Sequence, residues 1–168
     1  MRILLSGLLF LALLPACKKS STDTNNNNNN TTITDGWKLG TATHTTEMTQ
    51  RPSGSTAGFA TIGLMAMQGF TPTTSPDNIT AYFATYPTTS GTYRVVAFPG
   101  TGALAAGETY VIASGPGTGS YGSTGAGTVD VTVTVNASGK ATIVIPDITL
   151  RKLSGTEELV AGGTIRER

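Results

Sequence analysis

The sequence predicts an all-β domain, an antiparallel β-sandwich of about eight short strands, with a small β-barrel as the alternative architecture. Three observations favour this fold class. Residues 36–168 are rich in Thr, Val and Gly and contain few Leu, Lys and Glu, a composition typical of strands and tight turns. Turn residues recur at short intervals. Residues 129–135 alternate strictly between valine and a polar residue, with the period of two of a half-buried strand.

The first sixteen residues have the organisation of an export signal. Arg2 supplies a positive charge, and residues 3–14 are apolar apart from Ser6 and Gly7. A lasting transmembrane helix needs about 20 apolar residues to cross the hydrocarbon core. The shorter run in this chain is therefore predicted to be the core of a signal peptide, residues 1–16.

Residues 14–17, which read Leu-Pro-Ala-Cys, resemble the lipobox of bacterial lipoproteins. The resemblance implies that the signal is cleaved before Cys17, that the Cys17 thiol receives a diacylglycerol, and that the new amino terminus is acylated. Two or more acyl chains make a stable membrane anchor, whereas one holds a protein only marginally. Because Cys17 is the only cysteine, the chain can form no internal disulfide and no cysteine-based metal cluster.

A polar tether is predicted between the anchor and the domain, over residues 17–35. It contains an unbroken asparagine run at residues 25–30 and almost no large apolar side chain, so it should be disordered. Its length as a flexible coil is about 20–25 Å, and Lys18 and Lys19 could be attracted weakly to anionic headgroups. The lipobox and this tract together resemble lipoproteins of Bacteroidota. The resemblance implies a cell-envelope protein of the outer membrane, with the periplasmic or surface face undecided.

Five strands are predicted before residue 115, separated by turns and loops of Pro, Gly, Ser and Thr. A short helix over residues 60–67 is the weaker alternative for the second strand, since Gly63 and its flanking glycines disfavour it. Residues 115–127 are predicted to form a long loop. The five strands are residues 37–45, 58–68, 79–85, 92–98 and 109–114.

A β-hairpin is the clearest structural prediction in the C-terminal third. Residues 128–136 carry the valine alternation, residues 137–139 are a turn, and residues 140–146 alternate again. The second strand should continue through Ile148 and Leu150. The last strand is predicted at residues 159–166.

Sequence motifs for nucleotide binding are incomplete in this chain. Residues 117–122 match G-x-G-x-x-G, but a dinucleotide site also needs a helix that begins there to hold the pyrophosphate. In this chain the motif leads directly into the strand at residue 128, which favours a β–β connection. Gly139-Lys140 lacks the upstream glycine and the following Ser or Thr of a P-loop. No cofactor is predicted.

The residues that could perform catalysis or bind a metal are few. His44 is the only histidine and lies in a threonine-rich predicted strand, where a solvated or sheet-facing side chain is expected. No metal site is predicted, because the usual sites need several His, Cys or carboxylate ligands. A loop Ca²⁺ site at Asp77-Asn78 lacks the spacing of an EF-hand. Nucleic acid is an unlikely partner on composition, since clustered Lys and Arg are missing.

Aromatic residues give the one hint of a binding surface. If Ile79, Ala81 and Phe83 face the core, Tyr82 and Tyr86 fall on the opposite face of the strand. Exposed tyrosine rings can stack on a sugar or a peptide and form hydrogen bonds with it. Trp37 could join them or could fix the first strand to the core.

Three functions remain open from the sequence, and no catalytic residue is assigned. The first is a membrane-anchored envelope lipoprotein whose β domain binds a glycan, a peptide or another envelope protein without catalysing a reaction. The second is a small glycan-acting hydrolase with two carboxyl groups brought together by loops. The third is a structural or assembly subunit, recognisable by an apolar patch or an unpaired edge strand.

Overall fold

The structure is a computed structural model that describes residues 34–168 apart from residues 57–58, 61, 72 and 98–102. Residues 31–168 form one compact unit. The signal peptide, Cys17 and the tether up to residue 33 lie outside the described residues, so the predictions made for them stay predictions.

The described part of the chain is all-β, as predicted, and contains strands but no helix. The helix alternative for residues 60–67 is wrong, because β6 covers most of that segment. The strands are β1 Gly36–Leu39, β2 Ala42–Thr45, β3 Met48–Gln50, β4 Ser55–Thr56, β5 Phe59–Ala60, β6 Ile62–Gln68, β7 Asp77–Phe83, β8 Gly91–Val95, β9 Glu108–Gly115, β10 Gly119–Ser123, β11 Asp130–Val135, β12 Ala141–Lys152 and β13 Glu158–Arg166.

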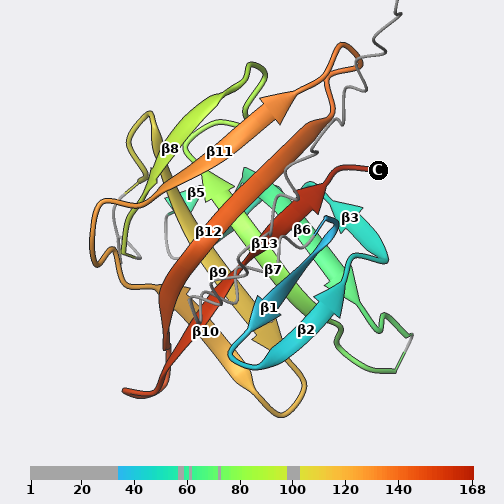
Figure 1. Cartoon of the computed structure of the whole chain (residues 1–168), viewed down its shortest axis with the longest axis vertical. Helices are drawn as coiled ribbons and strands as arrows, with labels where there is room; N and C mark the ends of the chain where they lie inside the picture. Colours follow the sequence, from blue (N-terminus) through green and yellow to red (C-terminus); the bar gives the residue numbers. More distant parts are fainter. Residues whose placement is uncertain (1–33, 57–58, 61, 72, 98–102) are drawn as a thin grey trace, which may run out of the picture. The chain divides into compact units, whose positions relative to one another are not determined.

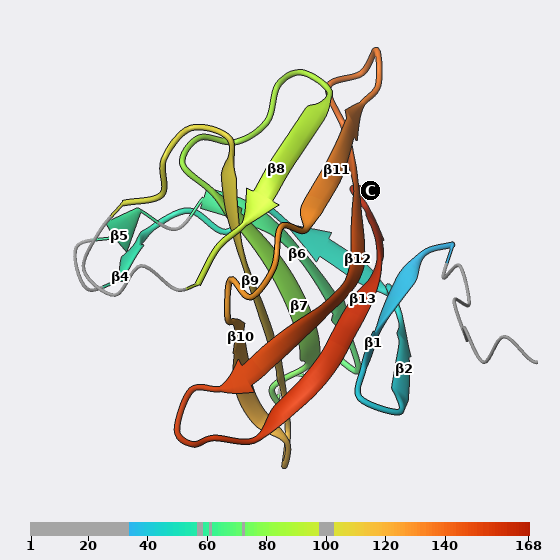
Figure 2. The same cartoon turned by 60° about the vertical axis from the view of Figure 1, so that its left-hand side comes forward.

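Eleven strands belong to a single sheet, and β4 and β5 form a separate hairpin. The order along the sheet is β2-β1-β13-β12-β11-β8-β9-β7-β6-β3, and β10 pairs with both β9 and β12. In Figure 1 the strands β11, β12 and β13 lie in front and cross the strands β9, β7 and β6 behind them. Figure 2 shows the same two layers from the side. One continuous sheet therefore folds over on itself, where the sequence suggested two separate sheets.

The strand pairing is antiparallel with one exception. β8 and β9 run parallel, with Arg94 opposite Glu108 and Val95 opposite Thr109. Parallel neighbours cannot be joined by a tight hairpin and need a longer connection, and β8 ends at Val95 whereas β9 begins at Glu108. The sheet is therefore mixed, and the prediction of a purely antiparallel sheet is wrong at this pair.

The hydrophobic core lies between the two layers. Ile79, Ala81 and Phe83 of β7 face it, as the sequence predicted, and all three are fully buried. From the opposite layer, Val133 of β11 and Ile143 of β12 are cross-strand partners and enter the same core. Full burial of an aliphatic or aromatic side chain of this size stabilises a fold by about 1.5–3 kcal/mol, so these alternating positions hold the layers together.

The predicted C-terminal hairpin is confirmed. β11 pairs with β12 from Thr132–Val144 to Val135–Ala141. β12 continues through Ile148 and Leu150, as predicted, and pairs with β13. The register shifts between Ile145 and Ile148, around a proline that has no N–H to give to a ladder. The bulge lets one strand carry core residues on both sides of Pro146.

The described residues form thirteen strands where about eight were predicted. β3 and β4 lie where no strand was predicted, and residues 58–68, predicted as one strand, contain β5 and β6. Two further segments differ from their predictions. Residues 37–45 were predicted as one strand but form the hairpin β1–β2, with Gly40 in the turn at φ +61°. Residues 115–127 were predicted as a loop but contain β10. The Gly-Ser-Tyr-Gly-Ser sequence of β10 has almost no apolar alternation, and its strand conformation comes from its hydrogen-bonded neighbours, β9 and β12.

Gly63 gives a test of how closely β6 and β7 pack. A Cβ atom at Gly63 would collide with the backbone carbonyl of Ala81, whereas a Cβ atom at Gly91 in β8 would meet only the Tyr93 ring, 3.9 Å away. We expect Gly63→Ala to lower the free energy of unfolding by about 1–3 kcal/mol. Gly91→Ala, the matched control, should be neutral or stabilise the strand by about 0.5–1 kcal/mol. Urea unfolding of both variants checks this, and equal effects would contradict it.

Candidate functional site

The three aromatic residues singled out in the sequence lie in three different surroundings. Trp37 of β1 is buried in the core, with 1% of its surface exposed. Its ring stacks on that of His44, its cross-strand partner in β2, with the ring centroids 5.0 Å apart and the planes 13° from parallel. Trp37 therefore fixes the β1–β2 hairpin to the core, the second of the two roles considered for it.

His44 lies between Trp37 and an acidic side chain. Its Nδ1 atom is 3.8 Å from Oδ2 of Asp77, and 14% of the His44 side chain is exposed. The adjacent backbone N–H of Thr45 donates to the side-chain carbonyl of Gln68, at 3.2 Å. Gln68 and Asp77 are partners in the β6–β7 ladder. His44 thus packs where the edge strand β2 passes the ends of β6 and β7. Within the described residues, no three His, Cys, Asp or Glu side chains cluster as metal ligands would.

Tyr86 takes part in a polar cluster with Arg51 and Glu167. Its hydroxyl donates to Oε2 of Glu167 at 3.0 Å, and the Arg51 guanidinium lies over its ring, 4.1 Å from the centroid. Burial, together with the hydrogen bond to the Glu167 carboxylate, raises the pKa of Tyr86 to about 12. The ring also packs against the main core. These contacts leave Tyr86 half-buried and engaged within the domain.

Glu167 is the centre of this cluster. Arg51 donates to both carboxylate oxygens, from Nε at 2.5 Å and from Nη2 at 2.9 Å, and the Ala141 N–H donates to Oε2 at 2.9 Å. Burial alone would raise the pKa of Glu167, but the hydrogen bonds from Arg51, Ala141 and Tyr86 outweigh it and hold the pKa below its usual range. Arg51 follows β3, Tyr86 follows β7, Ala141 begins β12 and Glu167 follows β13, so one carboxylate joins four parts of the fold.

Tyr82 lies on the outer face of the sheet, beside a tyrosine that the sequence analysis did not single out. Tyr82 and Tyr110 are cross-strand partners in β7 and β9, with their ring centroids 6.4 Å apart and their planes 23° from parallel. Tyr82 is half-buried, whereas 1% of Tyr110 is exposed. Burial raises the pKa of both phenols, that of Tyr110 to about 12 with a contribution from Tyr82. In residues 109–114 the side chains alternate between the two faces of the strand, so a core-facing Val111 puts Tyr110 on the outer face. This alternation could have identified Tyr110 as a neighbour of Tyr82.

Apolar side chains surround this tyrosine pair. Ala84, Val96, Leu104 and Ile112 pack with the two rings in a second hydrophobic cluster. The ladder registers place Met48, Met65 and Met67 on the same face as Tyr82. Met65 is opposite Thr80, which is two residues from Tyr82 in β7, and Met67 follows two residues after Met65 and is opposite Met48. We call the partly exposed members of this surface, Met48, Met65, Tyr82 and Ile112, the outer tyrosine face.

The carboxylates of the domain are engaged individually. A hydrolase that uses two carboxyl groups needs them to face each other across the scissile bond, about 5–9.5 Å apart. In the described residues, six carboxylates each form an ion pair with a different Lys or Arg side chain, and a seventh, that of Asp77, lies beside the His44 ring. The six pairs are Lys38–Asp147, Arg51–Glu167, Arg94–Glu108, Arg151–Glu158, Lys152–Glu157 and Arg168–Asp35.

The G-x-G-x-x-G segment forms part of a β-hairpin. Residues 117–122 make the turn between β9 and β10 and most of β10 itself. Gly117 and Gly119 adopt positive φ angles of 79° and 84°, which L side chains rarely adopt. The glycines therefore serve a tight turn between two paired strands, whereas the sequence analysis predicted that the motif lies in a long loop.

Comparison of the chain with protein families, curated proteins and solved structures finds no match in any of the three. In the described part of the chain no helix has the length and apolar character to span a membrane.

Glu167 gives a prediction about stability and pH. Replacing its carboxylate with an amide leaves Arg51 without its ion-pair partner, so Glu167→Gln should lower the free energy of unfolding by about 2 kcal/mol at pH 7. Glu158→Gln is the control, because that side chain forms an exposed pair with Arg151, and it should cost less than about 1 kcal/mol.

The pH dependence follows from the lowered pKa of Glu167. A carboxylate with a depressed pKa in the folded state stabilises the fold above its unfolded pKa, and this contribution is lost as the pH falls through the folded pKa. The difference between native protein and Glu167→Gln should therefore shrink below about pH 4.3. Unfolding curves at several pH values measure it, and a difference that grows in acid would contradict this assignment.

Proposed function

We propose that this chain is a membrane-anchored envelope lipoprotein whose β domain binds a ligand, a glycan or an extended peptide, on the outer tyrosine face without catalysing a reaction. The observation that carries the binding role is that one layer of the sheet bears apolar and aromatic side chains on both of its faces. A sheet with one solvated face ordinarily alternates apolar and polar residues. In β7, Phe83 faces the core while Tyr82 stands on the opposite face, next to Tyr110.

The chemistry of the face suits a flat or extended ligand. A tyrosine ring offers an apolar surface for stacking and a hydroxyl for hydrogen bonding. The neighbouring Met48 and Met65 are flexible and polarisable, and methionines are used at surfaces that adapt to their ligands. Tyr110 supports the half-buried Tyr82 from the next strand, so the Tyr82 ring is held in a fixed orientation, which reduces the entropy lost on binding.

The membrane anchor is supported by the sequence alone. Residues 14–17 carry the lipobox pattern, and Cys17 is the only cysteine available for acylation. A tether of polar residues then leads to the domain, which begins where Thr34 and Asp35 contact the C-terminal arginines. We place the protein in the outer membrane, as a lipoprotein of the cell envelope.

Acylation of Cys17 is tested by growing cells with an alkyne-bearing fatty acid and attaching a dye to the purified protein. The native chain should take up the label and fractionate with membranes. Cys17→Ser should lose the label and leave the membrane fraction. The control Ser20→Ala, a substitution in the same tether, should behave as the native chain does. An unlabelled native protein would overturn the anchor.

Protease treatment of intact cells, with lysed cells as the control, determines which face carries the domain. Digestion on intact cells would point to capture of external glycans or peptides. Protection until lysis would point to a ligand in the periplasm, where cell-wall glycan is the first probe.

Tyr82→Ala tests the binding surface. The variant loses one stacking contact between the Tyr82 ring and the ligand, which is worth about 0.5–1.5 kcal/mol. Its affinity for the best ligand on a glycan and peptide array should therefore fall by about tenfold. Thr132→Ala, on the exposed side of β11 in the opposite layer, should leave the affinity unchanged. Equal affinities of native protein and Tyr82→Ala, with both folded, would contradict the proposed surface.

A further inference from the structure

Two cationic side chains of the domain have no acidic partner. The chain has eleven Lys and Arg residues, and three of them, Arg2, Lys18 and Lys19, precede the domain. Of the eight in the described residues, six form ion pairs with carboxylates. Lys140 and Arg166 are the two without such a pair. The other cations are each balanced by a carboxylate. The place where Lys140 and Arg166 lie is therefore the positive part of the domain.

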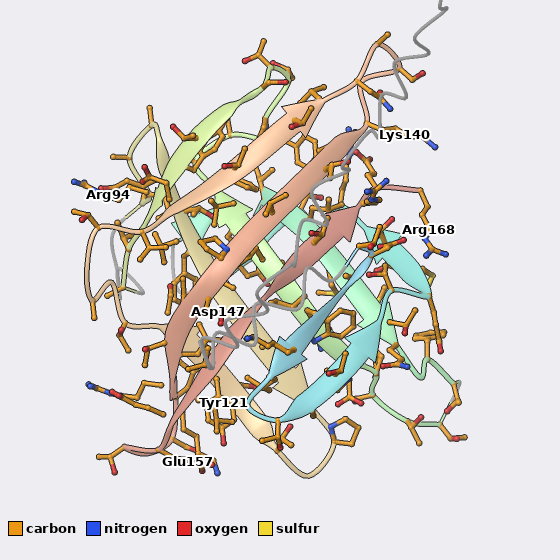
Figure 3. The ribbon with its side chains drawn as sticks, viewed as in Figure 1. Arg94, Tyr121, Lys140, Asp147, Glu157 and Arg168 are labelled. Carbon is orange, nitrogen blue, oxygen red and sulfur yellow. The ribbon has the colours of Figure 1, made fainter. Side chains whose placement is uncertain are left out.

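Both unpaired cations lie at the end of the domain where the chain enters it. Arg166 is the cross-strand partner of Thr142, two residues beyond Lys140 in the sequence. The Arg166 Nε atom donates to the backbone carbonyl of Thr34 at 3.0 Å, where the described chain begins. Figure 3 shows Lys140 and Arg168 toward one end of the domain and Glu157 at the opposite end.

The charges at this end sum to a positive value. Arg51 donates to the Gly139 carbonyl and to Glu167, which places it beside the β11–β12 turn. Arg168 pairs with Asp35. With Lys140 and Arg166 there are four cations against three carboxylates, those of Asp35, Glu167 and the nearby Glu47, which accepts a hydrogen bond from the Gly69 N–H. The described domain as a whole has nine carboxylates against its eight cations, so the remainder of the domain is negative.

We propose that this tether end, defined by Arg51, Lys140, Arg166 and Arg168, docks on the anionic lipid headgroups of the membrane that holds the protein. The inference rests on the lipid anchor proposed above. The predicted tether, about 20–25 Å long as a flexible coil, would keep the domain at an effective concentration of order millimolar at the surface, so a weak attraction suffices. The negative remainder of the domain is repelled by the same headgroups, which fixes the orientation.

Docking in this way determines which parts of the domain point outward. Figure 2 shows the β9–β10 and β12–β13 turns together at the end of the sheet opposite the β11–β12 turn. These two turns would project away from the bilayer. The outer tyrosine face, on β3, β6, β7 and β9, would stand at the side of the docked domain and remain open to a ligand.

Two single-cysteine reporters test the orientation on the acylated full-length protein. With Cys17 acylated, a cysteine introduced at Ser138 in the β11–β12 turn, or at Ser154 in the β12–β13 turn, is the only thiol that can take a fluorescent label. The protein is reconstituted in vesicles of phosphatidylcholine, alone or mixed with phosphatidylglycerol, that contain a lipid-borne quencher. We expect quenching at position 138 with phosphatidylglycerol, weak quenching at position 154, and loss of the difference at about 1 M salt, where charges are screened within about 3 Å.

Charge variants separate docking from a general charge effect. Lys140→Gln with Arg166→Gln should lower the ratio of docked to undocked protein by about 30-fold, which corresponds to about 1 kcal/mol for each cation at an anionic surface. Arg94→Gln with Arg151→Gln makes the same charge change on exposed cations elsewhere and should change the ratio less than about threefold. Circular dichroism confirms that each variant is folded.

Three results would each overturn the docking proposal without contradicting the lipid anchor. They are equal quenching at positions 138 and 154, quenching that does not depend on phosphatidylglycerol, and an equal fall in the docked fraction of the two double variants. A failed anchor gives a different result: the protein does not stay with the vesicles, and Cys17 itself takes the label. That result would overturn both proposals.

Discussion

The ion pair and hydrogen bonds of Glu167 are the constraint on which closure of this fold depends. A single sheet that folds over on itself must bring together strands that are distant in the sheet order. β10 does so by pairing with β9 and with the C-terminal end of β12, whereas side-chain contacts do so at the N-terminal end of β12. Glu167 does this with one carboxylate, which accepts from the guanidinium of Arg51, the hydroxyl of Tyr86 and the N–H of Ala141. Charged hydrogen bonds in a partly buried place are stronger than neutral ones. The last residues of the chain therefore hold the layers in position, although they lie beyond the last strand.

The layered core could be predicted from the sequence because its strands carry a regular alternation. Val131 and Val133 are separated by Thr132, Ile143 and Ile145 are separated by the exposed Val144, and the structure buries all four core residues. A pattern of this kind determines both the strand and the face that it buries. The β1–β2 hairpin and β10 do not carry it. Their strand conformation depends on neighbours far away in the sequence, and no local pattern of Gly, Ser and Thr encodes those neighbours.

The candidate site shows the same limit. Tyr82 and Tyr86 are four residues apart, and alternation places them on one face only if the strand continues through both. β7 ends at Phe83, so the backbone turns before Tyr86, which then reaches Glu167 and Arg51. Tyr82 stays on the outer face, as expected, and gains Tyr110 as a neighbour. The strand end, which is the least certain feature of a sequence-based prediction, thus decided which tyrosine belongs to the surface.

The distribution of charge links the anchor to the binding face. Most charged side chains of the domain are neutralised in pairs within one or two neighbouring strands, such as Arg151 with Glu158 and Arg94 with Glu108. Pairs of this kind add little stability, but they neutralise much of the surface charge. The two cations without an acidic partner lie beside the point where the chain enters the domain. A domain whose unpaired cations lie there is attracted to its own membrane at that end, and its uncharged tyrosine face can meet a ligand without competition from that attraction.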